Sequence, residues 1–113
     1  MIKEYYYTMS MRDTGDVLVS RRGGLRALVD TAVTRILDCL VESGGACSMS
    51  EISRRSDVSW LTVYRIIPRL VSLGVIAEEE RRGKSRLFRL NDRSRVAQII
   101  AELSREMGQV EVT

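Results

Sequence analysis

The stretch from Ser48 to Gly74 constrains the fold most, because it has the pattern of two short helices joined by a tight turn. Ser48 has the chemistry of a helix N-cap, and Glu51 follows three residues later, which completes a capping box. The side chains of Ser56 and Asp57 compete with the backbone for hydrogen bonds and therefore favour a turn. The sequence thus predicts a helix-turn-helix unit over this stretch.

The second helix of this unit has an apolar face and a polar face, and Ser59 is its N-cap candidate. The apolar residues recur at helical spacing and are Val63, Ile66, Ile67 and Leu70, with Trp60 at the edge of the stripe. The opposite face and its flank carry Leu61, Thr62, Tyr64, Arg65, Pro68, Arg69 and Ser72. Arginine pairs with guanine, and leucine or threonine methyl groups contact the thymine methyl group. This face therefore suits the major groove of DNA, and an ordinary solvated helix face is the alternative.

The segment TVYRIIPRLVSLGVI resembles the recognition helix of MarR-like and TrmB-like winged helix-turn-helix regulators, where a Thr-Val-x-Arg start leads to Leu and then Gly-x-Ile. The resemblance extends from about Leu25 to Leu90. It implies an α+β fold that is mainly α, with a three-helix core and a β-hairpin wing. Pro68 departs from the pattern, because it removes the hydrogen bond to the carbonyl of Tyr64. We expect the helix to kink there or to end its first part early.

Basic residues are concentrated in the helix-turn-helix unit and the segment after it. Residues 54–95 hold 11 Lys and Arg against 5 Asp and Glu, whereas the rest of the chain holds 7 against 10. A basic region that coincides with such a motif is typical of a nucleic-acid-binding face.

The 113 residues predict a single domain, and no apolar run approaches the ~20 residues of a membrane span. The N-terminus lacks the layout of a signal peptide, so we expect a cytoplasmic protein.

The first 42 residues divide into an N-terminal segment and a long helix. Within residues 1–24, Ile2–Met9 and Val17–Val19 have the composition of strands, so a hairpin and an extended arm are both open, followed by a basic hinge. Leu25–Glu42 is predicted as one helix that ends at Ser43-Gly44-Gly45. Its apolar stripe, predicted to be core, consists of Leu25, Leu28, Val29, Ala32, Val33, Ile36, Leu37, Leu40 and Val41.

After Gly74 the sequence predicts a β-hairpin that forms the wing. Its strands are residues 75–80 and 86–90, joined by a tip at residues 81–85, with Phe88 and Leu90 facing inward and Leu87 and Arg89 outward. In the winged-helix families the tip reaches a flanking phosphate strand or the minor groove. The residues suited to phosphate contact are Arg81, Arg82, Lys84 and Arg86. The acidic residues 78–80 would repel DNA, so we expect them at the base of the wing.

A last helix, capped by Asn91 or Asp92, is predicted to run to about Met107. Its apolar stripe consists of Val96, Ile99, Ile100, Leu103 and Met107. This spacing favours packing against the same helix of a second chain in a homodimer, and packing onto the first helix of its own chain is the alternative. The domain organisation is therefore an arm at 1–24, a winged helix-turn-helix domain at 25–90 and a dimerisation helix at 91–113.

The residue types present exclude several kinds of site. Cys39 and Cys47 are the only cysteines; their spacing fits no metal motif, and the chain contains no histidine. Both are expected to be small buried side chains, and a disulfide is the minor alternative. No metal, no cofactor and no enzymatic activity are predicted, because acid-base chemistry lacks its usual residues. Any effector, whose identity is unknown, would bind at a dimer interface or act through these cysteines.

The sequence therefore predicts a prokaryotic transcriptional regulator that binds double-stranded DNA sequence-specifically as a homodimer. The recognition helix, 59–73, would enter the major groove, and the wing, 75–90, would contact the flanking backbone or minor groove. The expected DNA-binding residues are Arg54, Arg55, Ser59, Leu61, Thr62, Tyr64, Arg65, Arg69, Arg81, Arg82, Lys84 and Arg86. The alternative is a winged helix that serves as a protein-interaction, architectural or partition module in a larger assembly.

Overall fold

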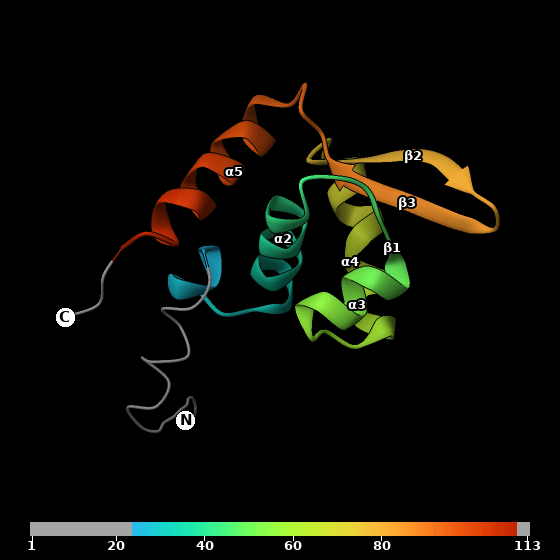
Figure 1. Cartoon of the computed structure of the whole chain (residues 1–113), viewed down its shortest axis with the longest axis horizontal. Coiled ribbons are helices and arrows are strands. Elements are labelled where there is room, and N and C mark those ends of the chain that lie inside the picture. The colour runs from blue at the N-terminus through green and yellow to red at the C-terminus, as the bar shows by residue number, and fades with distance from the viewer. Residues whose placement is uncertain (1–23, 111–113) are drawn as a thin grey trace.

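The computed structural model describes residues 24–110 (Figure 1). Its elements are η1 (Leu25–Ala27, a 3-10 helix), α2 (Ala32–Ser43), β1 (Cys47–Ser48), α3 (Met49–Ser56), α4 (Trp60–Ser72), β2 (Ile76–Arg82), β3 (Ser85–Leu90) and α5 (Arg95–Met107). This order of helices followed by a hairpin confirms the predicted α+β, mainly α, winged helix-turn-helix fold. The predicted strands and basic hinge of the N-terminal segment fall in residues 1–23, outside the described residues.

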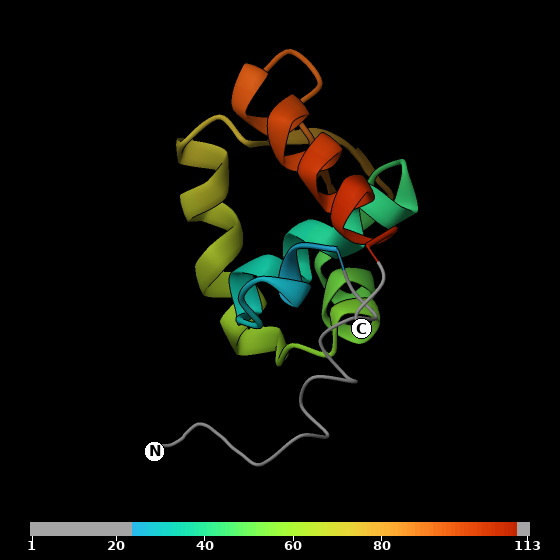
Figure 2. The same ribbon diagram turned by 90° about the vertical axis from the view of Figure 1, so that its left-hand side faces the viewer.

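Helix α2 lies at the centre of the described chain. Figure 1 shows η1 and α5 on one side of it and α3, α4 and the sheet on the other. The apolar side chains that become fully buried between these elements come from α2, α3, α4, β2 and β3, namely Ile36, Ile52, Val63, Ile67, Ile76 and Phe88. Seen from a second direction, α5 lies beside α2 and η1, while α4 lies apart from α5 (Figure 2). The single core therefore holds the helix-turn-helix unit and the C-terminal helix on opposite sides of α2.

The prediction of one continuous helix over Leu25–Glu42 is wrong. The chain forms the short η1, and α2 begins only after Thr31, whose hydroxyl accepts a hydrogen bond from the Thr34 amide in a capping box. Three residues predicted to be core are exposed instead, Leu28 and Val29 in the interruption and Val33 in the first turn of α2. The predicted end is confirmed, because Gly44 caps α2 in the left-handed conformation.

The helix-turn-helix unit forms as the sequence predicts. The hydroxyl of Ser48 accepts a hydrogen bond of 3.2 Å from the Glu51 amide, and the Glu51 carboxylate accepts one of 2.8 Å from the Ser48 amide. Asp57 ends α3 with a positive φ of 57°, in the turn predicted there. The hydroxyl of Ser59 caps α4 through the Thr62 amide. Local capping chemistry therefore sets the boundaries of both helices.

Helix α4 continues through Pro68 to Ser72, so of the two expected effects of Pro68, a kink or an early end, the early end is wrong. Pro68 removes one backbone hydrogen bond, but it lies on the exposed side of the helix. Ile67 and Leu70, on either side of it, are buried in the core. Their burial offsets the missing hydrogen bond, and the helix retains one exposed face along its whole length.

The sheet contains a strand that the sequence analysis did not predict. The two residues of β1 pair with β3, Cys47 opposite Phe88 and Ser48 opposite Leu87, which gives the antiparallel order β1-β3-β2. Leu87, which lies opposite Ser48 in this pairing, is buried as well as Phe88, contrary to the prediction that Leu87 faces outward.

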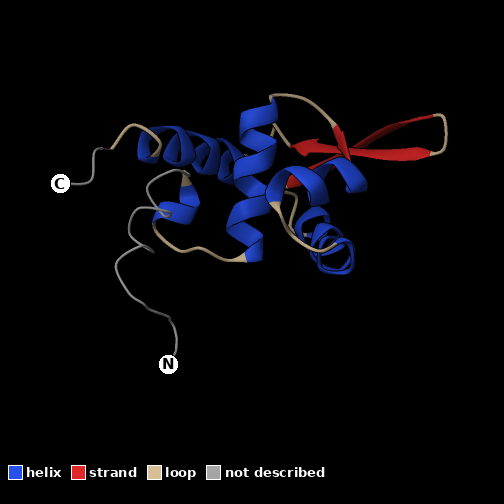
Figure 3. Cartoon of the chain, turned by 60° about the horizontal axis from the view of Figure 1, so that its bottom comes forward, coloured by secondary structure: helices blue, strands red, loops and turns tan. Residues whose placement is uncertain are grey.

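The wing is a longer hairpin with a shorter tip than predicted. Arg82 pairs with Ser85, so the turn consists only of Gly83 and Lys84. Gly83 has a φ of +64°, which two-residue hairpin turns require and which glycine adopts without steric cost. Figure 3 shows the two strands extending away from the helices. The wing therefore projects its tip beyond the compact part of the domain.

Helix α5 begins later than predicted and has two different sides. Ser94, rather than Asn91 or Asp92, is its N-cap, because the backbone and side chain of Asn91 form a turn with Arg93 and Ser94. The small residues Ala97, Ala101 and Ser104 are buried toward α2 and η1. Of the predicted dimer stripe, Ile100 and Met107 are partly buried. Val96, Ile99 and Leu103 are 56%, 46% and 42% exposed.

A buried carboxylate ties the two ends of the described chain to α2. Asp38 is 2% exposed and accepts hydrogen bonds from the amides of Leu25 (2.8 Å) and Arg26 (3.1 Å) and from the hydroxyl of Ser104 (2.9 Å). Gly24 lies so close to this site that a Cβ atom there would overlap the hydroxyl and carbonyl of Ser104. Asp38 therefore joins η1 and α5 through one side chain.

Replacing Asp38 should destabilise the fold. Asp38→Ala leaves the buried Leu25 amide and Ser104 hydroxyl without their acceptor, so the free energy of unfolding should fall by about 1–3 kcal/mol. Urea denaturation followed by circular dichroism measures this change. Glu42→Ala, on the exposed end of the same helix, is the matched control and should change it by less than about 0.5 kcal/mol. Equal effects of the two substitutions would contradict the assigned role of Asp38.

Candidate nucleic-acid interface

The N-terminal half of α4 presents exposed side chains of the kind expected at a base-reading surface. Leu61, Tyr64, Arg65 and, one turn later, Arg69 are exposed, and Thr62 is partly exposed. They are held in place because Val63, Ile67 and Leu70 on the opposite side of α4 are buried. The structure therefore brings the predicted base-contacting residues together on one face of one helix.

The hydroxyls at the start of α4 are committed to the helix cap. Ser59 accepts a hydrogen bond from the Thr62 amide, and its hydroxyl donates to the Thr62 hydroxyl over 2.8 Å. Both side chains stay at the surface. Each oxygen retains capacity to accept a further hydrogen bond, because a hydroxyl has two acceptor positions.

Two exposed arginines lie in the last turn of α3, directly before the turn that leads to α4. Arg54 extends from the surface, and Arg55 lies with its Nη1 atom 3.7 Å from the sulfur of Cys47. They place positive charge beside the start of α4, as the sequence predicts for contacts to a phosphate backbone.

The predicted phosphate-contacting residues of the wing differ in their surroundings. Lys84 is exposed in the turn, and Arg81 and Arg82 lie in the outer part of β2. Arg86 instead forms two hydrogen bonds of 2.8 Å to the carboxylate of Glu78, and its guanidinium lies 5.3 Å from the centre of the Phe88 ring. The hydrogen bonds to Glu78 raise the pKa of Arg86 above its usual value.

Two of the three consecutive acidic residues of the wing are neutralised by arginines of the neighbouring strand. Glu78 pairs with Arg86, and Glu79 pairs with Arg89, which also lies 3.5 Å from the carboxylate of Asp92. Opposite charges on neighbouring strands of a sheet stabilise its pairing. The acidic run of β2 is thus largely compensated within the wing.

Trp60 is a surface residue that the sequence analysis did not assign to the interface. It was placed at the edge of the buried stripe, but its side chain is exposed and stacks on Tyr64, with ring centroids 5.1 Å apart and planes inclined by 19°. The four-residue spacing puts both rings on the same side of α4. That spacing was the available signal, because Tyr64 had already been assigned to the outward flank.

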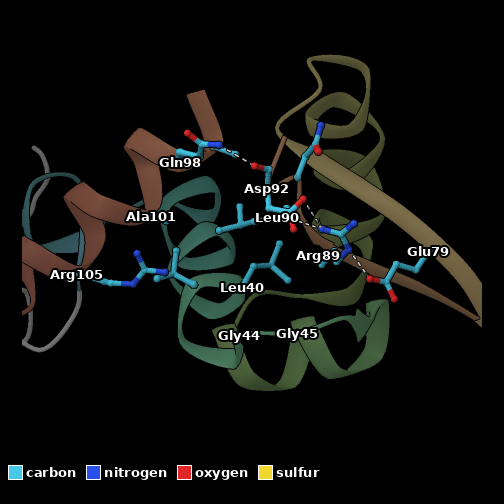
Figure 4. A pocket seen from close by; sticks show the side chains of 13 residues that line it. Leu40, Gly44, Gly45, Glu79, Arg89, Leu90, Asp92, Gln98, Ala101 and Arg105 are labelled. Carbon is cyan, nitrogen blue, oxygen red and sulfur yellow. Dashed lines mark hydrogen bonds and ion pairs between the residues drawn. The ribbon is translucent and has the colours of Figure 1, made fainter. Parts of the chain in front are cut away.

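A cavity of about 560 Å³ opens between the C-terminal end of α2, the base of the wing and α5 (Figure 4). Its apolar lining includes Leu40, Leu90 and Ala101, and Arg105 contributes a positive charge from α5. Pockets of about 300–1,000 Å³ accommodate small organic ligands. The sequence predicts any effector pocket at a dimer interface, whereas this cavity is formed within one chain.

Cys39 and Cys47 are both buried and both free thiols. Burial raises the pKa of Cys39 to about 11. Because the thiolate is the reactive form, this surrounding makes Cys39 a poor nucleophile at neutral pH.

Over residues 24–110, no group of three or more Cys, Asp or Glu side chains is arranged to hold a metal ion. Within the same residues, no helix has the length and apolar character needed to cross a membrane.

Residues 30–77, which include α2, α3, α4 and the start of β2, match the family described as winged helix-turn-helix DNA-binding. A search of curated protein sequences found no match. The fold is similar to that of several solved structures whose sequences are less than 25% identical to this chain, so these likenesses concern the fold.

Three of the similar structures illustrate the likeness. A MarR family transcriptional regulator from Silicibacter pomeroyi is 22% identical, with a TM-score of 0.53 over 74% of this chain and 60% of that one. A mutant MarR from E. coli, complexed with operator DNA, is 18% identical, with a TM-score of 0.54 over 80% and 64%. NadR in complex with 4-hydroxyphenylacetate is 15% identical, with a TM-score of 0.61 over 91% and 79%.

The present chain spans less than two thirds of the length of the first two of these proteins. Residues 30–77 thus match a winged helix-turn-helix DNA-binding family, and the fold of the described chain is similar to that of solved MarR family regulators.

Proposed function

We propose that this protein is a prokaryotic transcriptional regulator that binds specific sites in double-stranded DNA as a homodimer. The observation that carries the proposal is the exposed face of α4, which presents Leu61, Tyr64, Arg65 and Arg69 together within the matched domain. The major groove is wide enough to admit a helix, and its base edges offer acceptors to arginine and methyl groups to leucine. Binding to the chromosome would place the protein in the cytoplasm.

Phosphate contacts would fix the domain on the duplex on both sides of α4. Arg54 and Arg55 lie just before α4, and the wing carries Arg81, Arg82 and Lys84 near its tip. Arg86 would also contact phosphate, and it would have to exchange or share its bond with Glu78 to do so. Such contacts set the position of a protein on DNA, while base contacts provide specificity.

The exposed apolar side of α5 supports the proposed homodimer. Val96, Ile99 and Leu103 are exposed on α5 in the single chain, whereas Ala97 and Ala101 on its other side pack against the core. A second chain with the same stripe would cover these residues, together with the outer edges of Ile100 and Met107. We accordingly propose residues 25–90 as the DNA-binding domain and 91–113 as the dimerisation segment. Two recognition helices would then enter major grooves roughly 34 Å apart.

The cavity between α2, the wing base and α5 supports a second proposal, that a small organic anion regulates DNA binding. NadR has this fold and was solved with 4-hydroxyphenylacetate bound. In the present chain, the apolar walls formed by Leu40, Leu90 and Ala101 suit a ring, and Arg105 suits a carboxylate. The cavity is lined by residues of both the wing base and α5. A ligand there would therefore contact the wing, proposed to bind phosphate, and α5, proposed to form the dimer.

The DNA-binding proposal is tested by fluorescence anisotropy of a labelled random-sequence duplex across a salt series. The logarithm of the binding constant should fall linearly with log salt, with a slope near −0.9 per neutralised phosphate. Lys84→Ala should reduce the magnitude of the slope by about 1, and Arg65→Ala should weaken binding severalfold. Arg105→Ala removes the same charge from α5 and should leave both quantities unchanged. Absence of binding at low salt would refute the proposal and favour a protein-interaction module.

The homodimer is tested by sedimentation equilibrium. The wild-type protein should have twice the chain mass of 12.8 kDa at micromolar concentration. Leu103→Asp should weaken association at least a hundredfold, because an unpaired buried charge costs about 3–5 kcal/mol. Leu73→Asp, at an exposed leucine after α4, is the matched control and should remain dimeric. A wild-type mass of 12.8 kDa throughout would show that α5 does not mediate a dimer.

The effector proposal is tested by thermal unfolding with small aromatic carboxylates, beginning with 4-hydroxyphenylacetate. A compound that occupies the cavity should stabilise the folded state by about 2.7 kcal/mol at a concentration one hundred times its Kd. Arg105→Ala should reduce this stabilisation, whereas Lys84→Ala should retain it. If no compound raises the unfolding midpoint, or if the two variants respond alike, the cavity is not a carboxylate site.

A further inference from the structure

Three large apolar side chains are exposed together at the start of α4. Trp60, Leu61 and Tyr64 are 52%, 56% and 50% exposed, and we call them the apolar patch. Trp60 and Tyr64 stack on each other, and Leu61 is adjacent to Trp60 in the first turn. Within residues 24–110, this is the part of the helix-turn-helix unit where large apolar side chains meet solvent side by side.

The residues of the apolar patch are not needed for the packing of the hydrophobic core. Helix α4 already buries Val63, Ile67 and Leu70 on its opposite side, and these residues complete its contact with α2 and α3. Exposed apolar groups that adjoin one another indicate a binding surface more often than isolated ones do. The patch therefore calls for a partner with apolar groups of its own.

The charges around the patch indicate what that partner is. Arg65 and Arg69 are exposed on the same helix, and Arg54 and Arg55 lie just before it. A polyanion with embedded apolar groups fits this combination, and duplex DNA is one. The apolar group on the base edges of its major groove is the C5-methyl group of thymine.

We infer that the apolar patch reads thymine methyl groups, so that the preferred DNA sites carry thymines opposite the N-terminal half of α4. This inference rests on the proposed DNA-binding function and specifies the bases recognised. Leu61 contacts a methyl group directly, and the stacked pair of Trp60 and Tyr64 forms a rigid apolar wall beside it. Aromatic side chains have few rotatable bonds, so such a wall loses little conformational entropy on binding. Arg65 and Arg69 then bind guanine edges or phosphates beside these thymines.

The test begins with selection of bound duplexes from a random-sequence pool by the full-length protein. In a selected duplex, thymines are then replaced one at a time by uracil, which removes the C5-methyl group and keeps the base pair. At thymines under α4, each replacement should weaken binding roughly fourfold, since burial of one methyl-sized group contributes about 0.8 kcal/mol. Thymines elsewhere in the duplex should tolerate uracil without loss.

Variants of the protein link this methyl effect to the apolar patch. Leu61→Ala and Trp60→Ala should weaken binding to the thymine duplex and reduce the ratio between thymine and uracil duplexes toward one. Leu73→Ala truncates an exposed leucine at the other end of α4 and should preserve the wild-type ratio. Circular dichroism checks that the variants fold, and none of the three side chains belongs to the buried core.

The possible results separate this inference from the function on which it rests. If thymine and uracil duplexes bind equally well, the protein binds DNA but the methyl inference is wrong. If the ratio persists in both patch variants, the methyl groups are read by other residues and the inference is also wrong. If no duplex is selected or bound, both the inference and the proposed function fail.

Discussion

The arrangement of this domain depends on the buried carboxylate of Asp38. A carboxylate at 2% exposure is unfavourable unless hydrogen bonds compensate for its lost hydration. Here, the donors come from η1 and from Ser104 of α5, which lie 13 and 66 residues away from it in the chain. Satisfying Asp38 therefore requires Leu25 and Ser104, which lie toward the two ends of the described residues, to meet at α2. The apolar residues of the opposite side of α2 remain available to hold the helix-turn-helix unit.

Helix α2 packs against η1 and α5 on one side and against the helix-turn-helix unit on the other. Helix α4 therefore needs only one of its faces for packing. Val63, Ile67 and Leu70 secure it, and the face with Arg65 and Arg69 stays at the surface. The wing is stabilised in a different way, by β1 on one edge of β3 and by ion pairs between the acidic residues of β2 and the arginines of β3. These pairs reduce the repulsion that the acidic residues would exert on a nearby phosphate backbone. The fold thus leaves a helix face and a hairpin tip, both basic, outside its core.

Local chemistry made much of this structure predictable from the sequence. The capping box at Ser48, the cap at Ser59 and the helix end at Gly44 each depend on residues within a few positions of one another. The errors arose where distant residues decide the outcome. The segment before α2 forms η1, whose first amides bind the distant Asp38, and the two-residue β1 exists only because β3 pairs with it. The exposure of Trp60 likewise depends on the rotation of α4 about its own axis. The spacing of the apolar residues shows which face of the helix is buried, but it does not show on which side of that boundary an edge residue such as Trp60 lies.

We propose that the exposed face of α4 enters the major groove. Dimethyl sulfate footprinting tests it most directly, because the reagent methylates guanine N7 in the major groove and adenine N3 in the minor groove. On a selected duplex we expect the protein to protect guanine N7 in two segments about one helical turn apart, and Arg65→Ala to reduce that protection. If the bound protein leaves every guanine N7 of its site reactive, α4 does not enter the major groove.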